Sequence, residues 1–313
     1  MKKFQYILIL LCLISVTDIK AQFDAHFTHY WNMLNFYNPA GAGATGQLHA
    51  FAAYSNQLTG FTNNPKSMLI NGDLPLSMFK GDHSAGMGIL SDNIGMFTNQ
   101  HLYLNYAYAL KIFGGRLTIG AQVGMLSVKF DPKDLILENK DDPAIPKSAV
   151  DGSTYDLGLG VLFQHKYFYA GISALHLNAP LVEMGETNDF QIDPYYNFTA
   201  GGNIQLKNPL ISIQPSVQVM TDFVTYRADI TARGSYKYNE KLFFGGATYS
   251  PSTSVTFFAG MEVLNFTLSY GYELFTSGIG AKNGSHDIYL GYDIKLDLYK
   301  KGKNKHNSIR ILQ

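Results

Sequence analysis

The chain has 313 residues and a formal net charge of zero, and charged residues make up 15% of it. An ordinary soluble domain carries about 25% charged residues, and a protein that binds nucleic acid electrostatically needs an excess of Lys and Arg. Nucleic acid is therefore not an expected partner. The 21 Tyr, 21 Phe and 30 Gly residues suit strands and tight turns better than helices.

Residues 1–21 have the pattern of a secretory signal peptide. Lys2 and Lys3 precede an apolar run at 7–16, and the segment ends at Ala21 before Gln22. The apolar run is too short for a spanning helix, which needs about 20 residues, and no later stretch approaches that length, so a helical membrane protein is excluded. The single cysteine, Cys12, lies in the segment that would be removed. We therefore expect neither disulfides nor thiolate chemistry in the mature chain.

Residues 22–46 follow as a polar and aromatic stretch that is broken at Asn38–Pro39. We predict that this stretch is a short periplasmic arm that precedes the folded domain. It contains Gly41, Gly43 and Gly46 in the spacing of a dinucleotide-binding loop. Such a loop works only between a strand and a helix, and neither neighbour is expected here, so a flexible entry to the domain is the better interpretation.

Residues 47–299 alternate between apolar and polar side chains with a period of two, which places successive side chains on opposite faces of an extended strand. Tyr226, Ala228 and Ile230 alternate with Arg227 and Asp229 in the clearest example. The pattern predicts about fourteen strands, an even number that is typical of bacterial single-chain barrels. The expected strands are 47–58, 66–76, 83–91, 102–112, 117–125, 155–163, 167–177, 196–206, 211–219, 226–238, 241–249, 254–263, 264–274 and 287–298.

The connections between these strands favour an up-and-down barrel. Bacterial barrels alternate long outer loops with short periplasmic turns. The even-numbered connections are tight, at Gly114–Gly115, His165–Lys166, 207–209 and Asn239–Glu240. The two longest connections, 131–153 and 178–194, are odd-numbered and are expected to face outward.

The apolar faces of these strands are expected to contact lipid. Side chains fill a barrel of about eight strands, so fourteen strands would enclose too wide a lumen for a soluble protein. Lys or Arg at the middle of the bilayer costs roughly 2 to 4 kcal/mol, and the clearest strands place none on the apolar register. The fold class is thus all-β, an antiparallel transmembrane β-barrel. Inward charges such as Arg227, Arg233, Asp229 and Glu262 could tune a pore or could neutralise one another inside a plugged barrel.

The last segment, 300–313, is predicted to be a basic periplasmic tail. It carries five basic side chains, at Lys300, Lys301, Lys303, Lys305 and Arg310. A solvated end is the simpler interpretation, and a peptide that docks on a periplasmic partner is the alternative.

Several segments together resemble one family, the PorP/SprF proteins of the type IX secretion and gliding machinery. The resemblance runs through nearly the whole mature chain, although Ser55 and Leu58 stand where the family commonly has Arg and Trp. The segments that carry it are 29–32, 38–43, 54–60, 65–66, 93–97, 105–108, 141–143, 169–173, 176–177, 284–288 and 292. Among them the residues expected to have a structural role or to contact a partner are Tyr30, Asn38, Pro39, Ala40, Gly43, Asn56, Gln57, Gly60, Pro65, Gly95, Gly284 and His286.

The resemblance implies a non-enzymatic outer-membrane component that supports secretion or surface attachment of large adhesins. The implied partners are the outer-membrane bilayer, a PorK/PorN ring, a PorE-like lipoprotein and a secreted adhesin, and the implied localisation is the outer membrane after signal-peptide cleavage. No cofactor, metal site or catalytic residue is expected.

Two other functions remain open at this stage. A porin-like passive channel would use the charged lumen register. An outer-membrane hydrolase would need a catalytic triad, for which Ser285, His286 and Asp287 are only a local cluster, because neighbouring residues in a strand point to opposite sides. His26 and His29 could begin a metal site, but no acidic or cysteine ligands join them in sequence.

Overall fold

The computed structural model describes residues 25–76, 81–132, 146, 148–185, 188–276 and 283–295. The predicted signal peptide and the predicted basic tail both lie outside the described residues, and so does most of the predicted long connection at 131–153. The helices that are described are single turns: η1 (Tyr30–Asn32), α2 (Leu34–Tyr37) and η2 (Pro39–Gly41). No described helix is long and apolar enough to cross a membrane.

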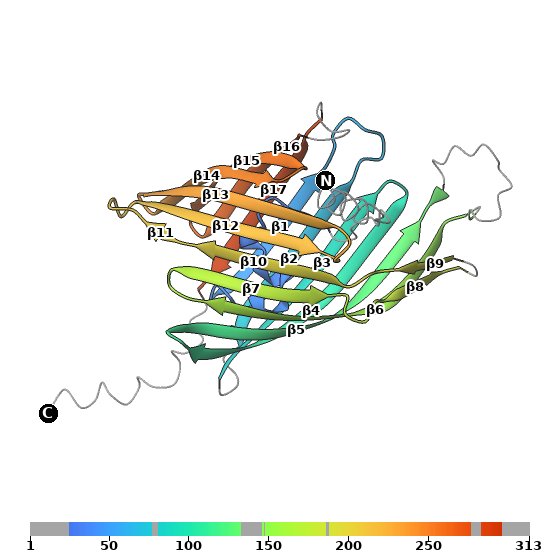
Figure 1. Ribbon diagram of the computed structural model, residues 1–313, viewed down its shortest axis with the longest axis horizontal. Coiled ribbons are helices and arrows are strands. Elements are labelled where there is room, and N and C mark those ends of the chain that lie inside the picture. The colour runs from blue at the N-terminus through green and yellow to red at the C-terminus, as the bar shows by residue number, and fades with distance from the viewer. Residues whose placement is uncertain are drawn as a thin grey trace, which may run out of the picture.

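The strands form one closed antiparallel β-barrel of fourteen positions (Figure 1). β1 pairs with both β2 and β17, and β10 pairs with both β7 and β12, so the ring has no gap. The barrel strands are β1 (Leu48–Asn56), β2 (Lys66–Leu76), β3 (Asp82–Ile94), β4 (Phe97–Ile112), β5 (Gly115–Phe130), β6 (Val150–Gln164), β7 (Phe168–Leu175), β10 (Tyr195–Gly202), β12 (Ile211–Thr221), β13 (Tyr226–Tyr238), β14 (Lys241–Ser250), β15 (Ser254–Val263), β16 (Phe266–Phe275) and β17 (Ser285–Ile294). The predicted fold class and number of strands are confirmed.

Three short strands complete the list. β11 (Ile204–Gln205) follows β10 in the chain and pairs with the same neighbour, β12. β8 (Leu181–Met184) pairs with β9 (Asn188–Gln191) in a separate hairpin. This hairpin occupies the predicted long connection between β7 and β10.

Backbone conformation at the tight turns explains the register of the hairpins. Asn239 and Glu240 both have positive φ, and so do Leu264 and Asn265 in the next even-numbered connection. Two consecutive residues in this region form the type I′ turn, whose twist matches that of the flanking strands. The turn at 264–265 was not predicted, because Leu264 continues the apolar register of its neighbours although its side chain is 81% exposed.

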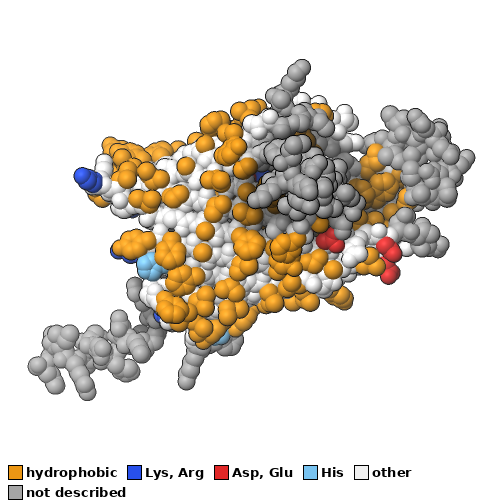
Figure 2. Space-filling model, viewed as in Figure 1, with side chains coloured by type: hydrophobic (Ala, Val, Ile, Leu, Met, Phe, Trp, Pro, Cys, Tyr) orange, Lys and Arg blue, Asp and Glu red, His pale blue; other side chains and the backbone are white. Residues whose placement is uncertain are grey.

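The apolar register faces outward, as predicted. Ile230 is 53% exposed and Leu290 is 48% exposed, whereas Asp229 and Asp287 on the opposite faces of the same strands are buried. Figure 2 shows hydrophobic side chains spread over the outer wall, with the charged side chains of this view near its two ends. An apolar outer wall over a polar interior is the arrangement of a barrel in lipid.

The predicted periplasmic arm lies elsewhere. Tyr30, Met33 and Tyr37 are almost completely buried, and they belong to one hydrophobic cluster with inward side chains such as Tyr103 and Tyr289 of the barrel wall. Residues 25–46, which we call the plug, therefore fill the lumen. A periplasmic location is wrong for these residues because their aromatic side chains are buried against strands on all sides of the barrel.

Candidate functional site: the lumen plug and the rim

The plug runs the length of the barrel interior. Its first described residues contact Asp229 and Asp287, which lie toward the barrel end that carries the odd-numbered connections. We call that end the rim. The plug ends at Gly46, two residues before the start of β1, at the opposite end of the barrel. The chain therefore crosses the lumen once before the first strand begins.

Polar side chains of the barrel wall hold the backbone of the plug. The Ser173 hydroxyl and the Asn197 amide donate to the Tyr37 carbonyl oxygen at 2.6 and 3.1 Å. Asn105 donates to both the carbonyl and the side-chain oxygen of Asn35, at 2.7 and 2.8 Å. A polar group left buried without a partner costs about 1 to 3 kcal/mol, so these contacts allow a broken backbone to lie inside the barrel.

Asn38 joins the plug to two strands. Its amide nitrogen donates to the carbonyl oxygens of Val161 and Ile172 at 3.1 and 3.2 Å, and its side-chain oxygen accepts from the Ala40 N–H at 2.9 Å. The hydrogen bond from Ala40 to the Asn38 side chain caps η2. Pro39 occupies the first turn of η2, a position where its missing N–H costs nothing. Asn38 and Pro39 thus fix the plug at a break in its helices.

Glycines in the barrel wall make room for this break. A Cβ at Gly120 would lie 2.2 Å from the Ala40 nitrogen, and one at Gly160 would lie 2.0 Å from the Asn38 side-chain oxygen. Gly43, which lies at the end of the plug away from the rim, has a φ of +68° and donates its N–H to Asp73 at 2.7 Å. The wall and the plug are therefore matched to each other in shape.

Substitution Gly120→Val is expected to lower the free energy of unfolding by about 1 to 3 kcal/mol, the usual cost of overpacking. The new side chain would meet the backbone of the plug at Pro39 and Ala40. Gly72→Val is the matched control, because a Cβ there meets only the His49 carbonyl oxygen at 3.8 Å. Denaturant unfolding of both variants in detergent measures the difference, and equal losses would contradict the close fit of plug and wall.

A charged network ties the start of the plug to the rim end of the wall. His26 contacts Asp229 at 2.9 Å, and Arg227 contacts Asp229 at 3.2 Å and Glu273 at 2.8 Å. The backbone N–H of Thr28 donates to Asp287 at 2.7 Å, and its hydroxyl donates to the same carboxylate. Four of the charged side chains that project into the lumen are thus neutralised or hydrogen-bonded around the plug.

Aromatic contacts fill the lumen below this network. The Trp31 ring lies 4.8 Å from Phe258, measured between ring centroids, and the Arg233 guanidinium lies 4.9 Å from the Trp31 ring. Such a cation–π contact is favourable when the cation is desolvated. Tyr30 completes the packing, and its hydroxyl contacts the hydroxyls of Ser216 and Thr231 at 2.8 and 2.9 Å.

His29 is a neutral side chain at the centre of the plug. Burial, and then the positive charge of Arg233, lowers the pKa of His29 from 6.5 to about 3. Because the Ser269 hydroxyl donates to the Ala259 carbonyl, the His29 Nε2–H donates to Ser269, at 2.7 Å. Nδ1 is buried without a hydrogen-bond partner, so protonation would leave a second N–H without an acceptor.

Acid is therefore expected to weaken the folded protein through His29. The His29 side chain of the unfolded protein binds a proton below about pH 6.5, whereas that of the folded protein stays neutral down to about pH 3. The free energy of unfolding therefore falls as the pH falls from about 6.5 to about 3. Wild type should lose more thermal stability between about pH 7 and about pH 4 than His29→Gln, whose amide keeps the bond to Ser269 without titrating. Melting curves at both pH values measure this, and equal losses would contradict it.

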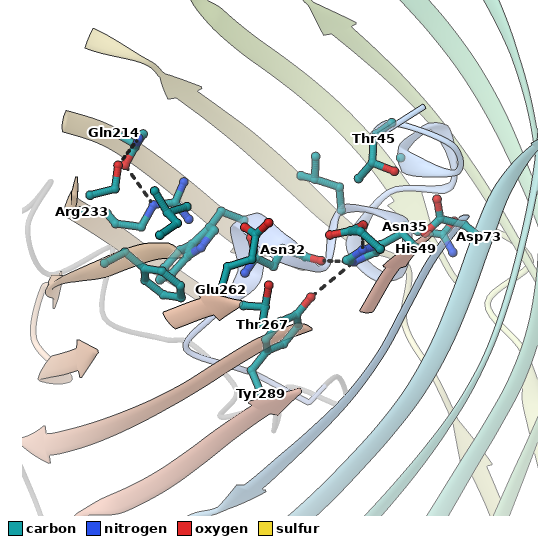
Figure 3. Close-up of a pocket in the computed structure, with 18 residues that line it drawn as sticks. Asn32, Asn35, Thr45, His49, Asp73, Gln214, Arg233, Glu262, Thr267 and Tyr289 are labelled. Atoms are coloured by element: carbon teal, nitrogen blue, oxygen red, sulfur yellow. Dashed lines mark hydrogen bonds and ion pairs between the residues drawn. The ribbon is translucent and has the colours of Figure 1, made fainter. Parts of the chain in front are cut away.

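A polar cavity of about 220 Å³ lies between the plug and the wall near the start of β1. Figure 3 shows Arg233 and Gln214 at one side of it and His49 and Asp73 at the other. His49 Nδ1 contacts Asp293 at 2.8 Å, and its Nε2 contacts the Asn32 carbonyl oxygen at 3.2 Å. Within the described ranges, no three His, Cys, Asp or Glu side chains are grouped so that they could hold a metal ion.

The twelve family residues predicted to have a structural role or to contact a partner fall into two places. Tyr30, Asn38, Pro39, Ala40 and Gly43 belong to the plug and make the contacts given above. The others lie at the rim, where the connections after β1, β3 and β16 meet: Asn56, Gln57, Gly60, Pro65, Gly95, Gly284 and His286. Which of them contacts a partner stays a prediction.

The rim residues hold three connections together. The Gln57 N–H donates to the Pro65 carbonyl oxygen at 2.9 Å, which closes the connection between β1 and β2. The Gly95 N–H donates to Asn63 at 3.2 Å, and the Thr59 N–H donates to Gly284 at 3.0 Å. The connection at 57–65 therefore joins the connection after β3 on one side and the connection after β16 on the other.

The local cluster at 285–287 does not form a triad. His286 Nδ1 contacts the Tyr270 hydroxyl at 2.6 Å on the outer side of the wall, whereas Asp287 faces the lumen and binds Thr28. The two histidines considered for a metal site also have separate partners, since His26 contacts Asp229 and His29 contacts Ser269.

The barrel resembles outer-membrane proteins of known structure. The CymD monoaromatic hydrocarbon channel superposes with a TM-score of 0.53 and 12% identity, over 89% of this chain and 95% of that one. The TodX monoaromatic hydrocarbon channel gives a TM-score of 0.48 and 10% identity, over 85% and 94%. At such identities the likeness concerns the fold alone.

Comparison by sequence gives a more specific result. Residues 19–292 match the model of a family described as type IX secretion system membrane protein PorP/SprF. No curated protein matches the sequence closely enough to count as a relative.

Proposed function

The chain belongs to the PorP/SprF family of type IX secretion system membrane proteins, and we propose that it supports the secretion or surface attachment of large cell-surface proteins without catalysis. In this proposal it joins a secreted adhesin or the translocon outside the cell to periplasmic components such as a PorK/PorN ring and a PorE-like lipoprotein. The family and the fold are those of a membrane secretion component or a channel rather than of a known enzyme.

The plug is the observation that carries this proposal. A passive channel needs a water-filled path through its lumen, whereas the described lumen contains a chain segment with Tyr30, Met33 and Tyr37 almost completely buried. A barrel filled in this way serves better as a rigid support than as a porin. This argues against the porin-like alternative.

The two ends of the barrel suit different neighbours. We orient it with the rim outside the cell, because the longer connections of bacterial barrels are extracellular. The rim then presents three joined connections to secreted proteins, and the start of β1 and the end of β17 face the periplasm. This orientation gives each set of proposed partners its own surface.

Deletion of the gene tests the proposal. One or more large surface proteins should disappear from the outside of intact cells and return on complementation, while uptake of small solutes remains unchanged. Surface proteolysis with mass spectrometry measures the first, and uptake of a labelled sugar measures the second. An unchanged set of surface proteins would refute the proposed function.

A further inference from the structure

Three strands of the barrel extend beyond the lipid at the rim. The outward residues Leu102, Met125 and Tyr155 form one row across β4, β5 and β6, and all three are apolar or aromatic and exposed. The next outward row is Gln100, Ser127 and Ser153, and the one after it is Thr98, Lys129 and Asp151. Because lipid-facing positions are apolar and aromatic side chains mark the interface, the polar rows lie in water.

The inner face of this projection is covered by the hairpin of β8 and β9. Val182 and Met184 of β8 share a small hydrophobic cluster with Leu126 and Val128 of β5, with Val150 and Phe190 packed against it. A Cβ at Gly152 would lie 2.1 Å from the Glu183 carbonyl oxygen, so the hairpin backbone crosses β6 in close contact. The projection is a small two-layer structure and does not depend on the membrane for its core.

One edge of the projection lacks a strand partner. β6 begins at Val150, but only its residues Leu159 to Gln164 pair with β7. In an antiparallel sheet the N–H and C=O of one residue point to the same neighbour, and Leu157 accepts from Leu177 on the β7 side at 2.9 Å. Alternate residues toward the rim, Tyr155, Ser153 and Asp151, must therefore direct their backbone groups to that side.

Asn178 occupies the first part of this edge. Its side-chain oxygen accepts from the Leu157 N–H at 3.0 Å, and its nitrogen donates to the Tyr155 carbonyl oxygen at 2.8 Å. The carboxamide thus takes the place of one peptide group of an adjacent strand. Beyond it, no strand of the described residues pairs with Ser153 or Asp151 on this side.

We propose that the β6 edge at 151–155 binds an extended segment of a secreted surface protein by β-strand addition. The choice of a secreted partner rests on the proposed function. Main-chain hydrogen bonds to an open sheet edge provide the affinity in such complexes. The edge stands in water at the rim, where a secreted chain arrives, and Asn178 shows that the edge accepts a peptide group at the next position.

A second copy of this chain does not fit the edge. Copies in one membrane are related by rotation about its normal, so both β6 strands run from the rim inward. With strand tilts of about 35 to 45°, edges that face each other would cross at roughly 70 to 90°. Paired strands differ by only about 20 to 25°, so the two edges could not form a ladder.

The test uses Ser153→Pro and the control Ser153→Ala. Proline removes the N–H that faces the open edge and leaves the pairing of β6 with β5 intact, and proline is tolerated on edge strands. The probe is the surface protein that gene deletion removes from the cell. Ser153→Pro should reduce the amount of that protein purified with the tagged barrel roughly tenfold, which corresponds to one lost hydrogen bond of about 1.4 kcal/mol.

Amide exchange gives a second measurement on the same proteins. The Ser153 amide should exchange quickly in the isolated barrel and slowly in the complex with its surface protein. Equal capture by the folded Pro and Ala variants would overturn the inference, and so would a slow amide in the isolated barrel, which would mean that this chain covers its own edge. If gene deletion removes no surface protein, the proposed function fails first, and the choice of partner fails with it.

Discussion

Deletion of residues 25–44 is expected to convert a silent barrel into a conducting one. The deleted segment fills the lumen, and the wall that it leaves behind is lined with polar side chains such as Asn71, Gln122 and Asn197. A barrel of fourteen strands is too wide for its own side chains to close, so water and ions should enter. Planar-bilayer recordings should show currents roughly tenfold or more above the wild type, as expected for a water-filled lumen.

Controls separate pore opening from loss of the barrel. The variant that lacks residues 25–44 must still change its mobility on gels after heating, as folded barrels do. Adding Arg233→Ala to this variant should change its ion selectivity, because Arg233 would then line the pore. A deletion variant that folds but does not conduct would contradict the conclusion that residues 25–44 close the lumen. Wild-type currents as large as those of the deletion variant would favour the porin-like alternative.

The barrel wall could be predicted from the sequence because the strands encode it residue by residue. A period of two places Ile230 outside and Asp229 inside without knowledge of any other strand, and the cost of charge in lipid selects the face. The turn at Leu264 and Asn265 could not be predicted in this way, since positive φ at Leu264 is set by the hairpin and not by the residue type.

The plug could not be predicted from its own residues. A polar and aromatic stretch with a proline break is equally typical of an exposed arm, because its partners come from strands up to 259 residues away, as in the contact between Thr28 and Asp287. A signal was present in the wall instead. Tyr103 and Tyr289 occupy the lumen register, where bulky aromatic side chains indicate an interior that is filled, and Gly120 leaves space for a backbone.

The placement of the family residues gives them a common physical meaning. The plug residues and the rim residues are far apart in sequence, but Thr28 of the plug binds Asp287, three residues after Gly284 of the rim. A force applied at the rim would therefore act on the start of the plug as well as on the wall. The proposed support function requires such a mechanical connection between the outer end of the barrel and its interior.

Substitution Arg227→Met is expected to destabilise the protein by about 3 to 5 kcal/mol, the usual cost of removing one member of a buried ion pair. The Arg227 side chain is 15% exposed, and its partners Asp229 and Glu273 are 0% and 5% exposed. Loss of the guanidinium leaves the two buried carboxylates without their shared partner, and the His26 ring is then the contact that Asp229 keeps with the plug. The fall in stability should be measured by denaturant unfolding at neutral pH.

Lys237→Met is the matched control, because Lys237 lies on the same strand with an exposed side chain and should change stability by no more than about 0.5 kcal/mol. The combined variant Arg227→Met, Asp229→Asn, Glu273→Gln should regain much of the loss, since no buried charge then lacks its counterpart. If Arg227→Met were as stable as Lys237→Met, the network would contribute nothing to holding the plug, and the remaining hydrogen bonds and the aromatic packing would hold it.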